Sequence, residues 1–212
     1  MSRVRWAGRW LAGTILLLTL TGCAAVQLAS REPPRLFQLT PKSTFDEALP
    51  EIDTRLILEV PTATAGLNTA RIALRPTPTT LEYYAGASWV DVLPVMVQQL
   101  IAESFDNANR VDVIGRDVIG VRADYALLTH LREFQAEYQG AAREPKVRIR
   151  IQARIVRLPR RISLASTSIE QVVEADGASV ERVVQAFDLA FGRVVKRLVE
   201  WTLVRLDEIE RS

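Results

Sequence analysis

The chain has very little of the two side chains most often used in catalysis and metal binding. It contains one histidine, His130, and one cysteine, Cys23, among 212 residues. A multi-histidine metal site and an internal disulfide are thereby excluded, so packing alone must hold the fold. The sequence has no P-loop or G-x-G-x-x-G motif. In addition, Gly86-Ala87-Ser88-Trp89 lacks the closing glycine of a nucleophile elbow. We therefore expect no catalytic residue, metal or cofactor and no enzyme activity, with His130 on a sheet surface or satisfied in the core.

The N-terminal segment has the pattern of a lipoprotein signal. A basic stretch with Arg3, Arg5 and Arg9 precedes an apolar run over 10–20, which is too short to span a bilayer. The run ends in Leu-Thr-Gly directly before Cys23, where small residues suit a signal peptidase and the thiol can take a diacylglyceryl group. This predicts a cleaved signal peptide at 1–22 and a lipidated Cys23. The alternative is an ordinary cleaved signal or weak anchor with a chance cysteine.

The lipid anchor also predicts a location. Two or three acyl chains hold a protein stably on a membrane. Ala24, rather than aspartate, follows Cys23, and by the sorting rule of enterobacterial lipoproteins this favours the outer membrane over the inner. We expect a protein of the cell envelope that faces the periplasm.

Cleavage changes the charge of the chain. Residues 1–22 hold three of the 27 basic residues and none of the 25 acidic ones, which leaves 24 basic and 25 acidic and a formal charge of −1. The mature protein is therefore not basic, which argues against nucleic acid as a partner.

The rest of the chain predicts one α+β domain. Four prolines among polar residues suggest a tether over 23–50, with a short strand at 36–39 docking it to a single domain over 51–212. Patterns of period two predict strands at 56–60, 71–75, 81–85, 111–114, 125–138, 147–158 and 161–173. Patterns of period 3.6 predict helices at 92–108 and 180–209. We expect a mostly antiparallel mixed sheet with two main helices packed on one face, the second C-terminal and long.

Three further features bear on structure and binding. A change of parity within 125–138 predicts a β-bulge near Arg132-Glu133. One face of the strand at 147–158 carries Arg148, Arg150 and Arg154, which suits either a solvated, ion-paired face or a contact with anionic headgroups or a partner. The aromatic residues Tyr83, Tyr84 and Trp89 belong either to the core or to a partner-binding surface.

The pattern of these residues resembles the ABC-type transport auxiliary lipoprotein family. The resemblance rests on the sequence at 81–84, Trp89, the helix at 93–105, and the sequences at 125–127 and 134–138. It covers nearly the whole mature chain but contains no catalytic motif. The family includes the lipoprotein partner of the paraquat-inducible intermembrane transport system. Only Cys23 can be carried over, as the lipidation site.

The resemblance implies partners and a role. The partners would be an MCE-domain protein and an ABC permease with its ATPase, which together move phospholipids or other hydrophobic solutes between membranes. The chain would be a non-catalytic adaptor and allows a homo-oligomer, whose copy number the sequence does not define. Two alternatives stay open: an envelope-assembly lipoprotein that activates a cell-wall or outer-membrane biogenesis factor, and a hydrolase with an atypical site.

Overall fold

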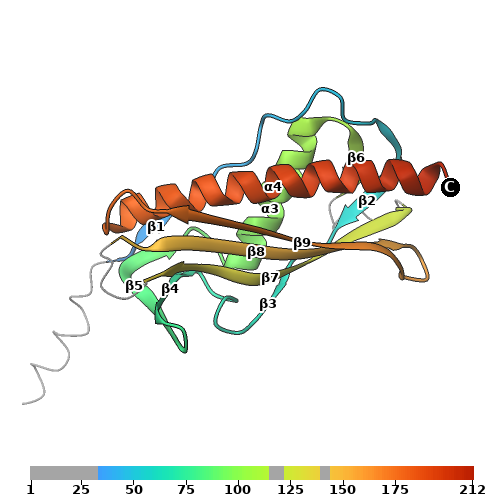
Figure 1. Ribbon diagram of the computed structural model, residues 1–212. Coiled ribbons are helices and arrows are strands. Elements are labelled where there is room, and N and C mark those ends of the chain that lie inside the picture. The colour runs from blue at the N-terminus through green and yellow to red at the C-terminus, as the bar shows by residue number, and fades with distance from the viewer. Residues whose placement is uncertain (1–32, 115–121, 139–143) are drawn as a thin grey trace, which may run out of the picture. The chain divides into compact units, whose positions relative to one another are not determined.

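Strand β7 (Tyr125–Glu137) joins the parts of the sheet. The computed structural model describes residues 33–114, 122–138 and 144–212. Along one edge, β7 pairs over its full length with β8 (Lys146–Arg157), which pairs in turn with β9 (Ile162–Glu174), both antiparallel. Three short parallel strands share its other edge: β2 (Ile52–Leu58), β3 (Thr62–Ala63) and β4 (Arg71–Thr77). The sheet therefore forks at β7 (Figure 1).

Each branch of the fork carries further strands. Strand β2 pairs in parallel with β6 (Val111–Ile114). Strand β4 forms an antiparallel hairpin with β5 (Thr80–Trp89), and β5 pairs in parallel with β1 (Arg35–Phe37). The described part of the chain thus forms a mixed sheet of nine strands, in which the longest pairings are antiparallel. This confirms the predicted α+β class.

The predicted bulge is present in β7. The register against β8 shifts between Leu131 and Glu133. A bulge adds one residue to one strand and so reverses the parity of the side chains that follow. As a result, Leu131 and Phe134 are both buried although three positions separate them. Because of the bulge, the apolar residues before and after it lie on the same face of β7, although their positions in the sequence shift from odd to even numbers.

Two helices complete the fold on one face of the sheet. Helix α3 (Leu93–Ala108) and helix α4 (Val180–Glu210) contact each other, and α4 packs on β8 and β9 (Figure 1). Ser179 is the N-cap of α4, and its hydroxyl accepts a hydrogen bond from the Arg182 amide at 3.5 Å. With 31 residues, α4 is about 46 Å long. No helix in the described ranges is both long and apolar enough to cross a membrane.

The segment from Arg35 to Pro50 corrects the predicted tether. The compact unit starts at Arg35, Leu39 is buried in the core, and the Thr40 amide donates to Asp188 Oδ1 of α4 at 2.7 Å. The Lys42 amide donates to Ser104 Oγ of α3 at 2.9 Å. The prolines here mark an irregular path over the helices rather than a free chain. The predicted signal peptide at 1–22, Cys23 and the tether up to residue 32 lie outside the described residues.

Candidate functional site

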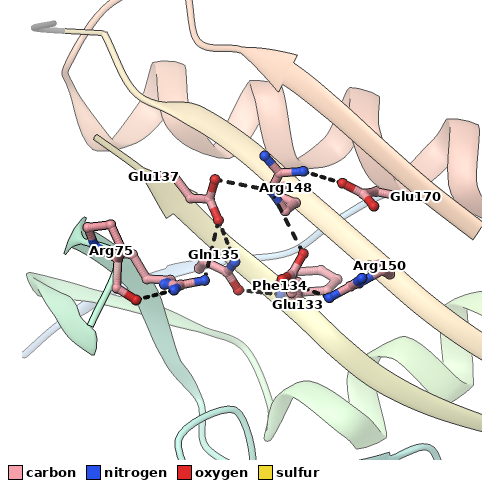
Figure 2. A network of polar contacts seen from close by, with 9 residues as sticks. Arg75, Glu133, Phe134, Gln135, Glu137, Arg148, Arg150 and Glu170 are labelled. Carbon is pink, nitrogen blue, oxygen red and sulfur yellow. Dashed lines mark hydrogen bonds and ion pairs between the residues drawn. The ribbon is translucent and has the colours of Figure 1, made fainter. Parts of the chain in front are cut away.

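The polar face of β7, β8 and β9, turned away from α4, carries a network of ion pairs. We call this face the outer face. Figure 2 shows the network, whose charged members are Arg75, Glu133, Glu137, Arg148, Arg150 and Glu170. The register explains the arrangement, because β7 carries acidic residues opposite basic residues of β8. Glu133 is opposite Arg150, and Glu137 is opposite Lys146, two residues from Arg148 along β8.

Arg148 is the centre of this network. Its Nε lies 3.0 Å from Glu137 Oε2 and 3.8 Å from Glu133 Oε2, and its Nη1 donates to Glu170 on β9. Burial disfavours the charge of the Arg148 guanidinium, but its hydrogen bonds to the carboxylates of Glu137 and Glu170 outweigh this effect and raise the pKa of Arg148. One arginine therefore links three carboxylates on two strands.

The remaining contacts extend the network to the backbone and to β4. Arg150 Nη2 donates to Glu133 Oε1 at 3.0 Å, and Arg75 Nη1 lies 3.6 Å from Glu137 Oε1. The buried Gln135 side chain donates to Glu137 at 3.0 Å and accepts from the Phe134 amide at 2.8 Å. The ion-paired interpretation of the basic strand face is therefore confirmed for two of its three arginines. The acidic partners were missed, although Glu133, Gln135 and Glu137 alternate and could have indicated a face complementary to β8.

A hollow lies on the same face, farther along the strands. Its volume is about 500 Å³, and it is lined by residues of β3, β7, β8 and β9. His130 lies here, half-buried, with Nδ1 2.8 Å from Thr62 Oγ1. Burial lowers the pKa of His130, and the charge of Arg132 lowers it further. His130 is thus a sheet-surface residue, one of the two predicted settings. Arg154, the third arginine of the basic face, is exposed at the hollow.

Trp89 is a core residue. Its side chain is 1% exposed, and its ring makes edge-to-face contacts with Phe134 at 6.2 Å and with Phe187 at 5.3 Å between centroids. The hypothesis that Trp89 contacts a partner is wrong for this structure, because the ring offers a partner no surface. It joins β5, β7 and α4 in one aromatic cluster.

Tyr83 and Tyr84 are half-buried, and both hydroxyl groups bond within the chain. The Tyr83 hydroxyl donates to the Gly66 carbonyl at 3.0 Å, and the Arg71 guanidinium lies 3.7 Å from the centre of its ring. The Tyr84 hydroxyl lies 3.1 Å from that of Tyr138. Burial raises the pKa of Tyr84, and the hydrogen bond with Tyr138 adds to the shift. The two rings hold the β5 hairpin to its neighbours, and their role in partner binding stays a prediction.

The charged side chains serve mainly to join strands. Within the described ranges, no three His, Cys, Asp or Glu residues are grouped so as to hold a metal ion. Each carboxylate of the network is held by at least one arginine of β8, so the network ties β7 and β9 to that strand.

Comparisons with known proteins identify the family. A model of the ABC-type transport auxiliary lipoprotein component matches residues 37–199. An uncharacterised protein from Bradyrhizobium diazoefficiens is 30% identical over 171 residues, which are 77% of this chain and 45% of that protein, so the chain spans less than half of this relative's length. A crystal structure of a Xanthomonas campestris protein superposes with a TM-score of 0.79 at 24% identity, over 84% of this chain and 99% of that one. A second crystal structure, of an uncharacterised protein, gives 0.61 at 10% identity, over 81% and 99%. The chain belongs to the ABC-type transport auxiliary lipoprotein component family.

Proposed function

We propose that this protein is a lipid-anchored, non-catalytic adaptor of an MCE/ABC-type system that moves phospholipids or other hydrophobic solutes between membranes. The observation that carries the proposal is the family match over residues 37–199, which takes in most of the compact unit. The partners would be the MCE-domain protein, the permease and the ATPase of the same system. ATP hydrolysis is assigned to those partners, since this sequence has no nucleotide-binding motif.

The anchor is assigned to Cys23. The cysteine sulfur would form a thioether with a diacylglyceryl group, and a further acyl chain such as palmitate would be carried on its amino group. Ala24 supports placement on the outer membrane, with the domain in the periplasm. A lipid anchor would hold the domain at the membrane surface, where it can contact membrane-bound partners, as an adaptor must.

The contact surface is assigned to the β5 hairpin, which carries Tyr83 and Tyr84. Leu81 lies on the same strand and is 41% exposed, although a large aliphatic side chain gains free energy from burial. The two tyrosine rings are partly buried against the core, and their hydroxyl groups bond to Gly66 and Tyr138, which fixes the hairpin to its neighbours. A rigid strand with an exposed apolar side chain suits contact with an MCE-domain protein.

A pull-down from detergent-solubilised membranes tests the adaptor role. The full-length tagged protein should recover the MCE-domain protein and the permease. A Leu81→Asp variant should recover much less, whereas Val172→Asp, which alters an equally exposed side chain on β9, should recover normal amounts. Recovery of neither component with the unaltered protein would overturn the proposal. Equal losses in both variants would overturn the assignment of the surface.

A fractionation experiment tests the anchor separately. Cys23→Ala should leave the domain folded and release it from the membrane fraction, because the compact unit begins at Arg35 and does not include the cysteine. Retention of Cys23→Ala on membranes that have been washed with salt would contradict lipid anchoring at this residue.

A further inference from the structure

The hollow on the outer face is built from two rows of cross-strand neighbours. In one row, His130 of β7 is opposite Gln152 of β8, which is opposite Ser168 of β9. In the other row, Arg154 of β8 is opposite Ser166 of β9. The rows are two residues apart along the strands, or about 7 Å. Thr62 of β3 closes one side. Hydrogen-bonding side chains from four strands thus surround one space.

The charge of this hollow differs from that of the ion-pair network on the same face. In the network, Arg148 and Arg150 are each opposed by carboxylates. The side chains that line the hollow include no aspartate or glutamate, and Arg154 has no ion-pair partner among the described residues. Arg154 lines the same hollow as His130, the charge of Arg132 also acts on the His130 ring, and β9 presents only small side chains to the hollow. The hollow is therefore positive and rich in hydrogen-bond donors.

These groups have the chemistry of an oxyanion site. An arginine guanidinium, two serine hydroxyls and a carboxamide are all donors to phosphate oxygens, and charge-assisted hydrogen bonds to phosphate are among the stronger ones in proteins. A cationic ligand would meet Arg154 without a counter-charge. The volume of about 500 Å³ exceeds that of a phosphate group and leaves room for an organic substituent.

We propose that the hollow formed by His130, Gln152, Arg154, Ser166 and Ser168 binds a phosphate oxyanion, with Arg154 as the charged contact. The phosphate belongs either to a free phosphate compound or to a lipid headgroup. The site is distinct from the β5 hairpin and does not depend on the proposed transport role. The interaction of Thr62 with Nδ1 holds the His130 ring and leaves Nε2 unbonded among the described residues.

The single histidine allows a direct test by NMR. The full-length protein, with a histidine-free affinity tag and labelled at histidine carbon, is kept in a nonionic detergent and titrated with inorganic phosphate, with glycerol 3-phosphate and with short-chain phosphatidylglycerol. A bound phosphate should shift the His130 resonance saturably and raise its pKa, because a nearby anion favours the imidazolium. Sodium chloride at matched ionic strength is the control for screening.

Two variants with the same change in charge identify the contact. Arg154→Gln should weaken binding about tenfold or more, the usual effect of losing a charge-assisted hydrogen bond. Arg160→Gln, on the exposed turn between β8 and β9, should bind as the unaltered protein does. Circular dichroism and thermal unfolding of the free proteins show that each variant is folded.

Every outcome decides the proposal. Binding of the two soluble phosphates without the lipid supports a free phosphate ligand, and tighter binding of phosphatidylglycerol supports a headgroup. If no probe gives a saturable shift, if sodium chloride reproduces the shift, or if Arg154→Gln binds as the unaltered protein does, the oxyanion site is overturned.

Discussion

Replacing Arg148 by methionine should destabilise the domain more than the same change at Arg150. Methionine keeps an unbranched apolar stem in place of the arginine methylenes and removes the guanidinium. At position 148 the change removes the hydrogen bonds to Glu137 and Glu170. Glu137 then keeps only its contact with Arg75, at 3.6 Å, among the arginines of the network. At position 150 it removes a single hydrogen bond to Glu133.

The magnitudes follow from exposure and from the number of partners. The Arg148 side chain is 27% exposed and has two hydrogen-bonded carboxylates. Hydrogen bonds to charged groups contribute about 1.5–3 kcal/mol each, and partial hydration together with relief of desolvation reduces the sum to about 2 kcal/mol. The Arg150 side chain is 41% exposed with one carboxylate, for which about 0.5 kcal/mol is typical.

Urea denaturation of the signal-free chain carrying Cys23→Ala measures both losses. With a slope of about 2 kcal/mol per molar urea, the Arg148→Met midpoint should fall by about 1 M and the Arg150→Met midpoint by about 0.3 M. Equal losses would show that the central position of Arg148 adds nothing. A gain in stability at Arg148→Met would show that desolvation of the guanidinium exceeds its attraction to the carboxylates.

Three further substitutions test other parts of the structure. Trp89→Ala should lower the free energy of unfolding by about 3–5 kcal/mol in denaturant titrations, and a loss under 1 kcal/mol would contradict its place in the core. Leu39→Ala should cost about 2–4 kcal/mol if residues before 51 belong to the domain, whereas a free tether would show no change. Because burial lowers the pKa of His130 in the folded state, the unfolded chain takes up a proton first as the pH falls through about 6.5. Stability should therefore fall more between pH 7 and 6 in the unaltered protein than in His130→Gln, and equal slopes would contradict the shift.

The long periodic elements could be predicted from the sequence. Helix α4 places Val183, Phe187 and Val194 on one buried stripe, and the spacing of three and four residues is visible without a structure. Strand β8 alternates in the same way between buried apolar residues and half-buried or exposed polar ones, most of them basic. Each pattern extends over several helical turns or several pairs of strand residues, so it rarely arises by chance in a segment of another structure.

The pairing of strands and the residues before 51 could not be predicted in this way. Periodicity reports which face of a strand is buried and not which neighbour it pairs with, so the parallel pairings of β1, β2 and β3 left no signal. Strand β3, with two residues, is too short to show alternation. Leu39 lies in a short segment bounded by Pro34 and Pro41, and it is buried because it joins a core that residues far away in the sequence build.

The site was predictable only in its parts. The basic face of β8 was visible, but its carboxylates lie on β7 and β9, and their contacts depend on the register. Trp89 illustrates the reverse difficulty. Its strand also carries two half-buried tyrosines, and only the aromatic rings of β7 and α4 that pack around Trp89 show that it is internal.

The pairing of β1 with β5 limits how far the domain can travel from its anchor. With Cys23 as the proposed lipid site, Arg35, the first residue of β1, lies twelve positions after it in the chain. Even a fully extended chain of that length reaches about 40 Å, whereas a tether up to residue 50 would have reached about 90 Å. With that anchor, the domain would be confined to a layer next to one leaflet, where its effective concentration would be high. A partner fixed in the opposite membrane must itself extend into that layer to be met.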